Sequence, residues 1–242
     1  MCNIIFPLEI REHILRFTGK NFTTVVKGIL GGTDIYYNYY SILERLVCKR
    51  IKKNSVGNSV CKLMLPGDIF HSSVQPSYVI KNEKGIILKE TWHHFERLHR
   101  KEPSIKSYYD DGTLKELTWC WENKMHRDNN LPAHIKYNIE GTILSETWYI
   151  NGNMKRTDNG IIDRQYYKNG LLRFEQFQLN LYNETHFIKY NENGNKNLEL
   201  WDKDTHLHRD NNLPAYKKYF PDGELKYDIW YTAGRRIRSV EY

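Results

Sequence analysis

The sequence of 242 residues predicts a mainly β fold. We expect an elongated antiparallel meander of stacked β-hairpin repeats, six units of about 29 residues, with a small helical N-terminal domain. Three observations predict this fold. A glycine recurs every 24 to 29 residues, a large aromatic residue follows each glycine by seven positions, and the octapeptide HRDNNLPA occurs at both His126–Ala133 and His208–Ala215. The predicted boundaries are residues 1–60 for the helical domain, 61–70 for a linker or cap, and 71–242 for the repeats.

The N-terminal segment shows no repeat and is predicted to be helical. Residues 6–17, FPLEIREHILRF, place proline in the first turn and repeat apolar residues at helical spacing. A second helix is predicted from Ser41 through Ile51, SILERLVCKRI. Between these helices, residues 27–32 and 36–40 are predicted to form a loop and a short helix.

Each repeat unit is marked by three residues at fixed offsets. The turn glycines are Gly85, Gly112, Gly141, Gly170, Gly194 and Gly223. The aromatic residues seven positions later are Trp92, Trp119, Trp148, Phe177, Trp201 and Trp230. Four positions before the glycine, five of the six units carry a tyrosine: Tyr108, Tyr137, Tyr166, Tyr190 and Tyr219. Because these offsets hold without adjustment, we predict that these residues form the core of the repeats.

Each unit is predicted to be a β-hairpin. Pairs such as Asp111-Gly112 and Asn169-Gly170 stand between aromatic and β-branched runs, where glycine supplies the positive φ of a tight turn. A two-residue turn would place the aromatic residue opposite the residue eight before the glycine: Ser77, Ser104, Ala133, Ile162, His186 or Ala215. Side-chain alternation puts the tyrosine on the tryptophan face, together with an acidic residue in five units: Glu90, Glu146, Glu175, Glu199 and Asp228.

A single hairpin cannot bury such an aromatic face, whereas stacked hairpins can bury it against each other. The repeats are therefore expected to fold together. An open sheet edge invites aggregation, so caps are expected before Pro76 and in the last residues, which end at Tyr242.

Charge and cysteine content limit the classes of partner. The net charge is +7 at pH 7. The first 60 residues hold nine Lys or Arg and four Asp or Glu, which leaves only +2 (7 − 5) for the repeats. A nucleic-acid platform would be more basic, so a nucleic-acid partner is not expected, and the basic cluster of residues 49–53 is interpreted as a solvated segment.

No apolar run is long enough to span a membrane. The four cysteines lack a Cys-x-x-Cys pair, which favours a reducing compartment such as the cytoplasm or nucleus.

The recurring residues are not expected to be catalytic or to bind a metal or cofactor. His99, His126 and His208 are each followed by arginine, and no cysteine or carboxylate recurs at a tetrahedral zinc spacing. A catalytic centre is normally asymmetric, whereas these residues repeat. We therefore interpret HRDNNLPA as a connector in which aspartate caps backbone amides and arginine bonds a carboxylate or carbonyl group of the next unit.

The repeats resemble MORN-type repeats in the variant form that is abundant in giant DNA viruses. The closest copy is HRDNNLPAHIKYNIEGTILSETWYINGN, residues 126–153. The resemblance covers about residues 71–242. The unit around Gly170 carries Phe177 for tryptophan, and the unit around Gly194 lacks Pro-Ala. The resemblance implies a β-hairpin repeat protein and says little about its function.

The N-terminal segment resembles an F-box. The matching residues are Pro7, Glu9, Ile10, Ile14 and Leu15, followed by Leu46, Val47 and Cys48. Phe6 and Ile51 stand where the family has leucine and tryptophan. The resemblance implies binding to the Skp subunit of a cullin-type ubiquitin ligase. The alternative is that these residues are the core of a helical cap on the repeats.

The function that we expect is a non-enzymatic protein–protein interaction module, an F-box-like adaptor whose repeat platform holds a client protein. The alternative is a virion structural protein or scaffold that packs against other proteins through its repeats. A third alternative is membrane-surface binding through the basic cluster and exposed aromatic side chains. We expect the protein in the cytoplasm or nucleus of a host cell, or within a virion.

Overall fold

The computed structural model describes the backbone of residues 22–27, 34–42, 45–53, 58–65, 69–70, 75–155, 157–179 and 184–242. Side chains are described for residues 58–62 and, from residue 75 onward, within the same ranges. The elements of these ranges are β-strands, and a division between Asn123 and Lys124 separates two units. Within each unit the strands form an antiparallel hairpin meander, as predicted.

Unit 1 is built from strands that pair mainly with their neighbours in the chain. The strands are β1 (Phe22–Lys27), β2 (Asp34–Ile42), β3 (Arg45–Lys53), β4 (Ser59–Leu65), β5 (Ile69–Phe70), β6 (Tyr78–Lys81), β7 (Ile87–Thr91), β8 (His93–His94), β9 (Arg97–Leu98), β10 (Ile105–Tyr108), β11 (Leu114–Thr118) and β12 (Cys120–Trp121). The main antiparallel series is β1, β2, β3, β4, β6, β7, β10 and β11. Strand β4 pairs with β6, the first strand of the repeats, and therefore covers its edge.

The helix predicted from Ser41 through Ile51 is wrong for the residues described there. They belong to β2 and β3, which pair from Ile35↔Lys52 to Ile42↔Arg45. The segment 36–40 also lies in β2 rather than in a short helix. Its tyrosine-rich sequence has high strand propensity, and β3 is paired on both sides, so tertiary pairing overrides the helical spacing of the apolar residues. The predicted helix at 6–17 lies outside the described residues.

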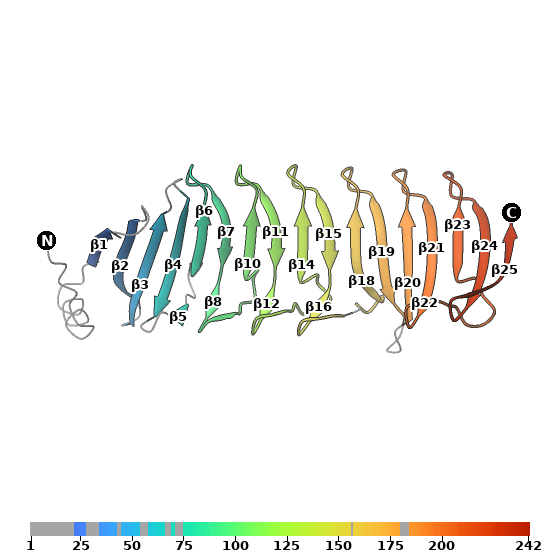
Figure 1. Ribbon diagram of the computed structural model, residues 1–242, viewed down its shortest axis with the longest axis horizontal. Coiled ribbons are helices and arrows are strands. Elements are labelled where there is room, and N and C mark those ends of the chain that lie inside the picture. The colour runs from blue at the N-terminus through green and yellow to red at the C-terminus, as the bar shows by residue number, and fades with distance from the viewer. Residues whose placement is uncertain are drawn as a thin grey trace. The chain divides into compact units, whose positions relative to one another are not determined.

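Unit 2 repeats the hairpin arrangement. Its strands are β13 (Lys124–Met125), β14 (His134–Tyr137), β15 (Ile143–Thr147), β16 (Tyr149–Ile150), β17 (Asn153–Met154), β18 (Ile161–Tyr166), β19 (Leu172–Gln178), β20 (Glu184–Tyr190), β21 (Lys196–Lys203), β22 (His206–Leu207), β23 (Tyr216–Tyr219), β24 (Leu225–Thr232) and β25 (Arg235–Glu241). Strands β14, β15, β18, β19, β20, β21, β23, β24 and β25 lie side by side in this order (Figure 1). The turns that join β14 to β15, β18 to β19, β20 to β21 and β23 to β24 lie at one end of the strands (Figure 1).

The hairpin turn is longer than the predicted two-residue turn. In the Gly141 turn, Gly141 donates its N–H to the carbonyl of Asn138, and Asn138 donates its own N–H to the carbonyl of Thr142. Gly141 has a φ of 84°, which favours glycine. A bulge between Lys136 and Tyr137 then shifts the register by one residue. The longer turn and the bulge offset each other, so the predicted pairing of the strands is preserved.

The register agrees with the prediction away from the turns. His186 pairs with Trp201 as predicted. In other hairpins the paired residues adjacent to the tryptophan have the predicted register. One example is His134↔Thr147, which is adjacent to the predicted pair of Ala133 and Trp148. The Gly170 hairpin differs, because Phe177 pairs with Ile161 rather than with Ile162.

The turns alternate between two kinds along the chain. In one kind, the asparagine three residues before the glycine accepts a hydrogen bond from the N–H just after the glycine: Asn82, Asn138 and Asn191. In the other kind that earlier position is aromatic, and the residue immediately before the glycine accepts the bond from the same N–H: Asp111, Asn169 and Asp222. The structural repeat is therefore a pair of hairpins rather than a single one.

The tryptophans occupy matching buried positions. Trp92, Trp119, Trp148 and Trp201 are each 6–8% exposed, and Trp230 near the end of the chain is half-buried. The small residues predicted opposite them, Ser77, Ser104, Ala133 and Ala215, are fully buried. The indole ladder is thus the core of the repeats.

Candidate functional site

The recurring tyrosines and carboxylates join successive hairpins. Tyr108 donates to Glu90 at 2.6 Å, and Tyr166 donates to Glu146 at 2.7 Å. The same bond joins Tyr190 to Glu175 at 2.9 Å and Tyr219 to Glu199 at 2.5 Å, and Tyr242 donates to Asp228 at 3.2 Å. In four of these pairs the phenol belongs to a later strand than the carboxylate, and Tyr242 directly follows β25. The tyrosines and acids therefore share one face, as predicted, and we refer to these contacts as the tyrosine–carboxylate ladder.

Cations complete this ladder in unit 2. Arg164 contacts Glu175 at 2.9 Å. The buried Oδ1 of Asp228 has no hydrogen bond, but the Lys217 ammonium lies 3.5 Å away and compensates part of its charge. His186 and Lys196 each lie 2.9 Å from Glu199.

Glu199 is the most strongly perturbed carboxylate of the described residues. Its burial favours the neutral form, but hydrogen bonds from His186, Tyr219 and Lys196 outweigh this effect and lower its pKa to about 2. Burial and the partner carboxylate raise the pKa of Tyr219. The histidine ring also stacks 4.2 Å from Trp201 and 5.5 Å from Phe177, so it fills the place of the small residue.

Connector arginines stack on the tryptophans. The guanidinium carbon lies 4.6 Å from the ring centre for Arg100 over Trp92. The corresponding distance is 3.8 Å for Arg209 over Trp201 and 3.9 Å for Arg238 over Trp230. Each arginine follows its tryptophan by eight residues, so this contact belongs to the repeat. The arginines therefore stabilise the core rather than mark a site.

The two copies of HRDNNLPA make the same contacts. Arg127 bonds the carbonyl of Pro132 at 3.0 Å, and Arg209 bonds that of Pro214 at 3.3 Å. The indole N–H of Trp148 bonds Asn130, and that of Trp230 bonds Asn212, both at 2.9 Å to the backbone carbonyl. These contacts agree with a connector function for the octapeptide. The predicted arginine partner is wrong, because each arginine bonds a carbonyl of its own octapeptide rather than a group of the next unit.

The predicted function of the connector aspartates is wrong. Asp128 and Asp210 contact the histidine two residues earlier, at 3.3 and 2.8 Å, through their carboxylates. The backbone carbonyls of the same aspartates, rather than their side chains, accept the turn hydrogen bonds from Leu131 and Leu213. The carboxylate of each aspartate lies against the imidazole, so the hydrogen bonds of the turn are made by backbone groups.

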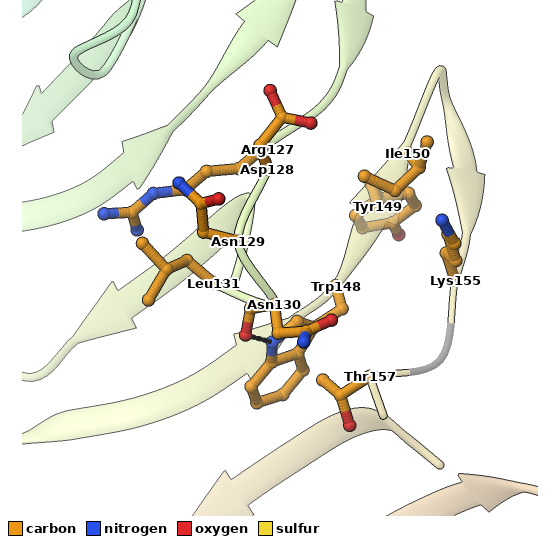
Figure 2. A pocket seen from close by; sticks show the side chains of 10 residues that line it. All are labelled: Arg127, Asp128, Asn129, Asn130, Leu131, Trp148, Tyr149, Ile150, Lys155 and Thr157. Carbon is orange, nitrogen blue, oxygen red and sulfur yellow. Dashed lines mark hydrogen bonds between the residues drawn. The ribbon is translucent and has the colours of Figure 1, made fainter. Parts of the chain in front are cut away.

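A small pocket lies against the first octapeptide (Figure 2). Its volume is about 110 Å³, enough for roughly three or four water molecules. Figure 2 shows the Trp148 indole between Asn130 and Thr157, with its hydrogen bond to Asn130, while Arg127 and Lys155 extend to opposite sides. Among the described residues that line it, Asp128 carries the only carboxylate, and this group contacts His126. These described residues offer polar contacts but no paired nucleophile and base.

A serine–histidine pair in unit 1 is structural. The Oγ of Ser77 lies 2.8 Å from Nδ1 of His93, and burial lowers the pKa of this histidine. Ser77 is fully buried, and its Oγ accepts the N–H of His93 just as Ser104 accepts that of Cys120. Because the contact recurs with a residue that is not histidine, it belongs to the repeat.

The described residues show neither a metal cluster nor a membrane-spanning helix. No group of three or more His, Cys, Asp or Glu among them could hold a metal ion. No helix in this part of the chain is long and apolar enough to cross a membrane. The Cys120 thiol is buried, which raises its pKa to about 11. This thiol is therefore a weak nucleophile at neutral pH.

The described structure covers three of the eight predicted F-box-like residues. Pro7, Glu9, Ile10, Ile14 and Leu15 lie outside the described residues. Leu46, Val47 and Cys48 lie on β3, an extended strand rather than the helix that the resemblance implies.

One surface was not predicted from the sequence. Across β18–β24, the row Gln165, Phe174, Lys189, Leu198, Lys218 and Tyr227 is formed by directly paired residues. The parallel row is Gln176, Phe187, Leu200, Tyr216 and Ile229. Both rows alternate with the ladder residues and so lie on the opposite face. We call Phe174, Phe187, Leu198, Leu200, Tyr216, Tyr227 and Ile229, with Lys189 and Lys218, the C-terminal aromatic face.

A hollow of about 420 Å³ opens at this face. Its lining includes Phe174 and Tyr167, the amides of Gln165 and Asn197, and the cations Arg173 and Lys189. The bulge of the Gly170 hairpin leaves Arg173 without a partner in the strand register. The repeated glycine pattern indicates where the bulges lie. It does not indicate that side chains near a bulge would line a hollow.

Comparisons with known proteins give the chain no family. No protein-family model matches it, and no curated protein is significantly similar to it.

Proposed function

We propose that the chain is a non-enzymatic protein–protein interaction module whose MORN-type repeats form a platform for a client protein. One observation carries the proposal: the recurring residues are used to hold hairpins together, whereas the C-terminal aromatic face has apolar residues that the repeat does not require. Such a division favours a scaffold with a binding surface on it.

The chemistry of the recurring groups supports a role without catalysis. Glu199 is surrounded by three donors, and Ser77 is fully buried. The octapeptide pocket holds little more than a few water molecules. A catalytic carboxylate or nucleophile has to reach a substrate, and these groups instead make contacts that recur along the chain.

The finer proposal is an F-box-like adaptor that recruits a client to a ubiquitin ligase. It is supported by the sequence match at Pro7, Glu9, Ile10, Ile14 and Leu15. The strand at Leu46–Cys48 departs from the F-box pattern, so the proposal depends on the first segment. The test is co-purification of the full chain with the host Skp subunit. We expect capture by the native chain and its loss with Ile14→Asp, while Lys20→Asp retains it. Equal capture by all three would contradict the adaptor proposal.

The platform proposal is tested separately with an affinity pull-down of the full chain from the native host cell. We expect one or a few client proteins at a fixed ratio to the chain, retained when Ile14 is replaced by Asp. Recovery of no protein that binds the purified chain directly would contradict the platform proposal.

A virion or scaffold protein is the second candidate. The observation that favours it is β25, which pairs only with β24 among the described strands and is exposed throughout. An open edge can add a strand from another chain. Presence at a defined ratio in purified particles would support this function over the adaptor.

A further inference from the structure

The C-terminal aromatic face differs from the neighbouring part of the same sheet surface. Toward β14 the two rows continue with Lys136 and Ser145, and with His134, Thr147 and Asp163. These residues are polar, and they support the same hairpins. The apolar side chains on β19–β24 are therefore not needed to form the sheet. Their presence is consistent with a binding surface.

Four rings of this face form two pairs, and the Lys226 ammonium lies 5.8 Å from the centre of the Tyr227 ring. Phe174 and Phe187 lie 6.0 Å apart, and Tyr216 and Tyr227 lie 6.1 Å apart with nearly parallel planes. The elements that pack extensively on β19–β24 are neighbouring strands of the same sheet. These side chains therefore remain half-buried on a one-layer surface.

The charges on this face are mostly positive. Arg173 and Lys189 are exposed at the hollow, and neither forms an ion pair with a carboxylate of the described residues. Lys218 contacts the amide oxygen of Asn197. None of the residues that line the hollow is acidic. An apolar centre with cations beside it is complementary to a partner that is apolar and negatively charged.

We propose that the C-terminal aromatic face docks an acidic amphipathic helix of a partner protein. The apolar side chains of that helix lie across the two rows, and its carboxylates reach Arg173 and Lys189. The strands are about 4.8 Å apart and a helix rises about 5.4 Å per turn, so successive turns meet successive strands. This inference rests on the proposed function, since it assigns the client surface and the chemistry of the client.

A nucleic-acid strand fits the face less well than a protein helix. Leu198, Leu200 and Ile229 are interleaved with the rings and offer no flat surface for a base. Residues 61–242 carry a net charge of only +2, because the first 60 residues account for +5 of the total charge of +7 (7 − 5). Binding along a phosphate backbone would require a more continuous row of cations.

The test measures binding of labelled probes to the full chain by fluorescence anisotropy. The probes are an amphipathic helical peptide with leucines on one side and glutamates on the other, the same peptide with lysines for glutamates, and a single-stranded oligouridine. We expect the glutamate peptide to bind the most tightly. Preference for the lysine peptide or for oligouridine would overturn the proposal.

Variants locate the binding surface. The double variant Arg173→Glu with Lys189→Glu is expected to weaken binding of the glutamate peptide at least about tenfold. Lys136→Glu, in the same row on the polar part of the sheet, is the matched control and leaves binding unchanged. Phe187→Ser weakens binding without changing the charge. Unchanged binding in the double variant, with its unfolding midpoint equal to that of the native chain, would overturn the proposal.

Client recovery separates this inference from the proposed function. If the pull-down yields a client that the double variant still binds equally, the assignment of the face is wrong while the platform function stands. If no client binds the native chain, the platform function itself fails, whatever the peptide result.

Discussion

The position opposite the tryptophan holds a small, fully buried residue in four of the six hairpins. These residues are Ser77, Ser104, Ala133 and Ala215. In the Gly194 hairpin His186 takes this place and stacks on Trp201. Where the residue is small, a larger side chain would have to displace a packed ring.

Replacing Ala133 with leucine tests this constraint. We expect the free energy of unfolding to fall by about 1–3 kcal/mol, because the added atoms meet the buried Trp148 ring. Urea unfolding followed by tryptophan fluorescence measures the change. Ile139→Ala, at an exposed turn, is the control and should stay within about 0.5 kcal/mol. Equal effects of the two variants would show that the indole slot is not tightly filled.

Glu199 makes stability depend on acid pH. Its pKa is about 2 in the folded chain and 4.5 in the absence of its partners. The contribution of this group is therefore complete above about 4.5 and is lost as the pH falls toward 2. We expect Glu199→Gln to lower the unfolding free energy at neutral pH by about 1–3 kcal/mol, since a charged hydrogen-bond acceptor is lost.

The measurement compares unfolding of the native chain and Glu199→Gln at neutral and acid pH. The difference between them should shrink as the pH falls through the stated range. Glu192→Gln, at an exposed turn, is the control and should show no such trend. A difference that grows in acid would contradict the assigned pKa direction.

At the scale of the turn, two positions alternate along the chain as the side-chain acceptor for the N–H that follows the glycine. Asn138 is buried and accepts the N–H of Thr142 at 2.8 Å. In the next hairpin, Asn169 accepts the N–H of Leu171 at 3.0 Å from the position immediately before the glycine. Both arrangements satisfy the same backbone group, so a hairpin needs one of them but not both.

Asn138→Ala is expected to lower the unfolding free energy by about 1–2 kcal/mol, because the N–H of Thr142 loses its acceptor. Glu140→Ala, in the exposed part of the same turn, should change it by less than about 0.5 kcal/mol. Thermal unfolding followed by circular dichroism measures both. A neutral Asn138→Ala would mean that water replaces the amide at no cost.

Much of the hairpin architecture could be predicted from the sequence, because period and alternation fix which residues share a face. The tryptophan, tyrosine and carboxylate positions follow from offsets to one glycine. The two kinds of turn could also have been found, since asparagine and an aromatic residue alternate three positions before the glycine.

Other features could not be predicted from local patterns. The apolar spacing in residues 41–51 fits a helix, and only pairing with β2 and β4 makes β3 a strand. The turn length could not be predicted, because a bulge restores the register of a shorter turn. The hollow near Arg173 depends on where bulged side chains point, which no linear pattern specifies.

At the scale of each unit, the tyrosine–carboxylate ladder makes neighbouring hairpins depend on one another. Each of these carboxylates accepts a phenol O–H from a residue later in the chain, on the following strand or, for Asp228, from Tyr242 after β25. A hairpin is therefore incomplete without its neighbour. Burial is the main cause that raises the pKa of Tyr108, Tyr166, Tyr190 and Tyr219 above 10, and the carboxylate partners add to it.

This arrangement predicts a cooperative loss of structure in alkali. A raised phenol pKa contributes stability that is complete below 10 and is lost as the pH rises toward the folded value. We expect the ladder tyrosines to ionise together with unfolding. Parallel pH titrations of phenolate absorbance and circular dichroism measure this. Ionisation of all tyrosines near the ordinary value, with the strands intact, would contradict it.

The alternation of turns also restricts how the length of the array can change. Asn82 donates its amide to the backbone carbonyl of Asp110 in the following aromatic turn, and Asn191 does the same to Pro221. Excision of a single hairpin would place two turns of the same kind next to each other. The hydrogen bond from the asparagine amide to the carbonyl of the aromatic turn would then be lost. Excision of two adjacent hairpins would leave the sequence of contacts in phase, so copy number is expected to vary by even steps.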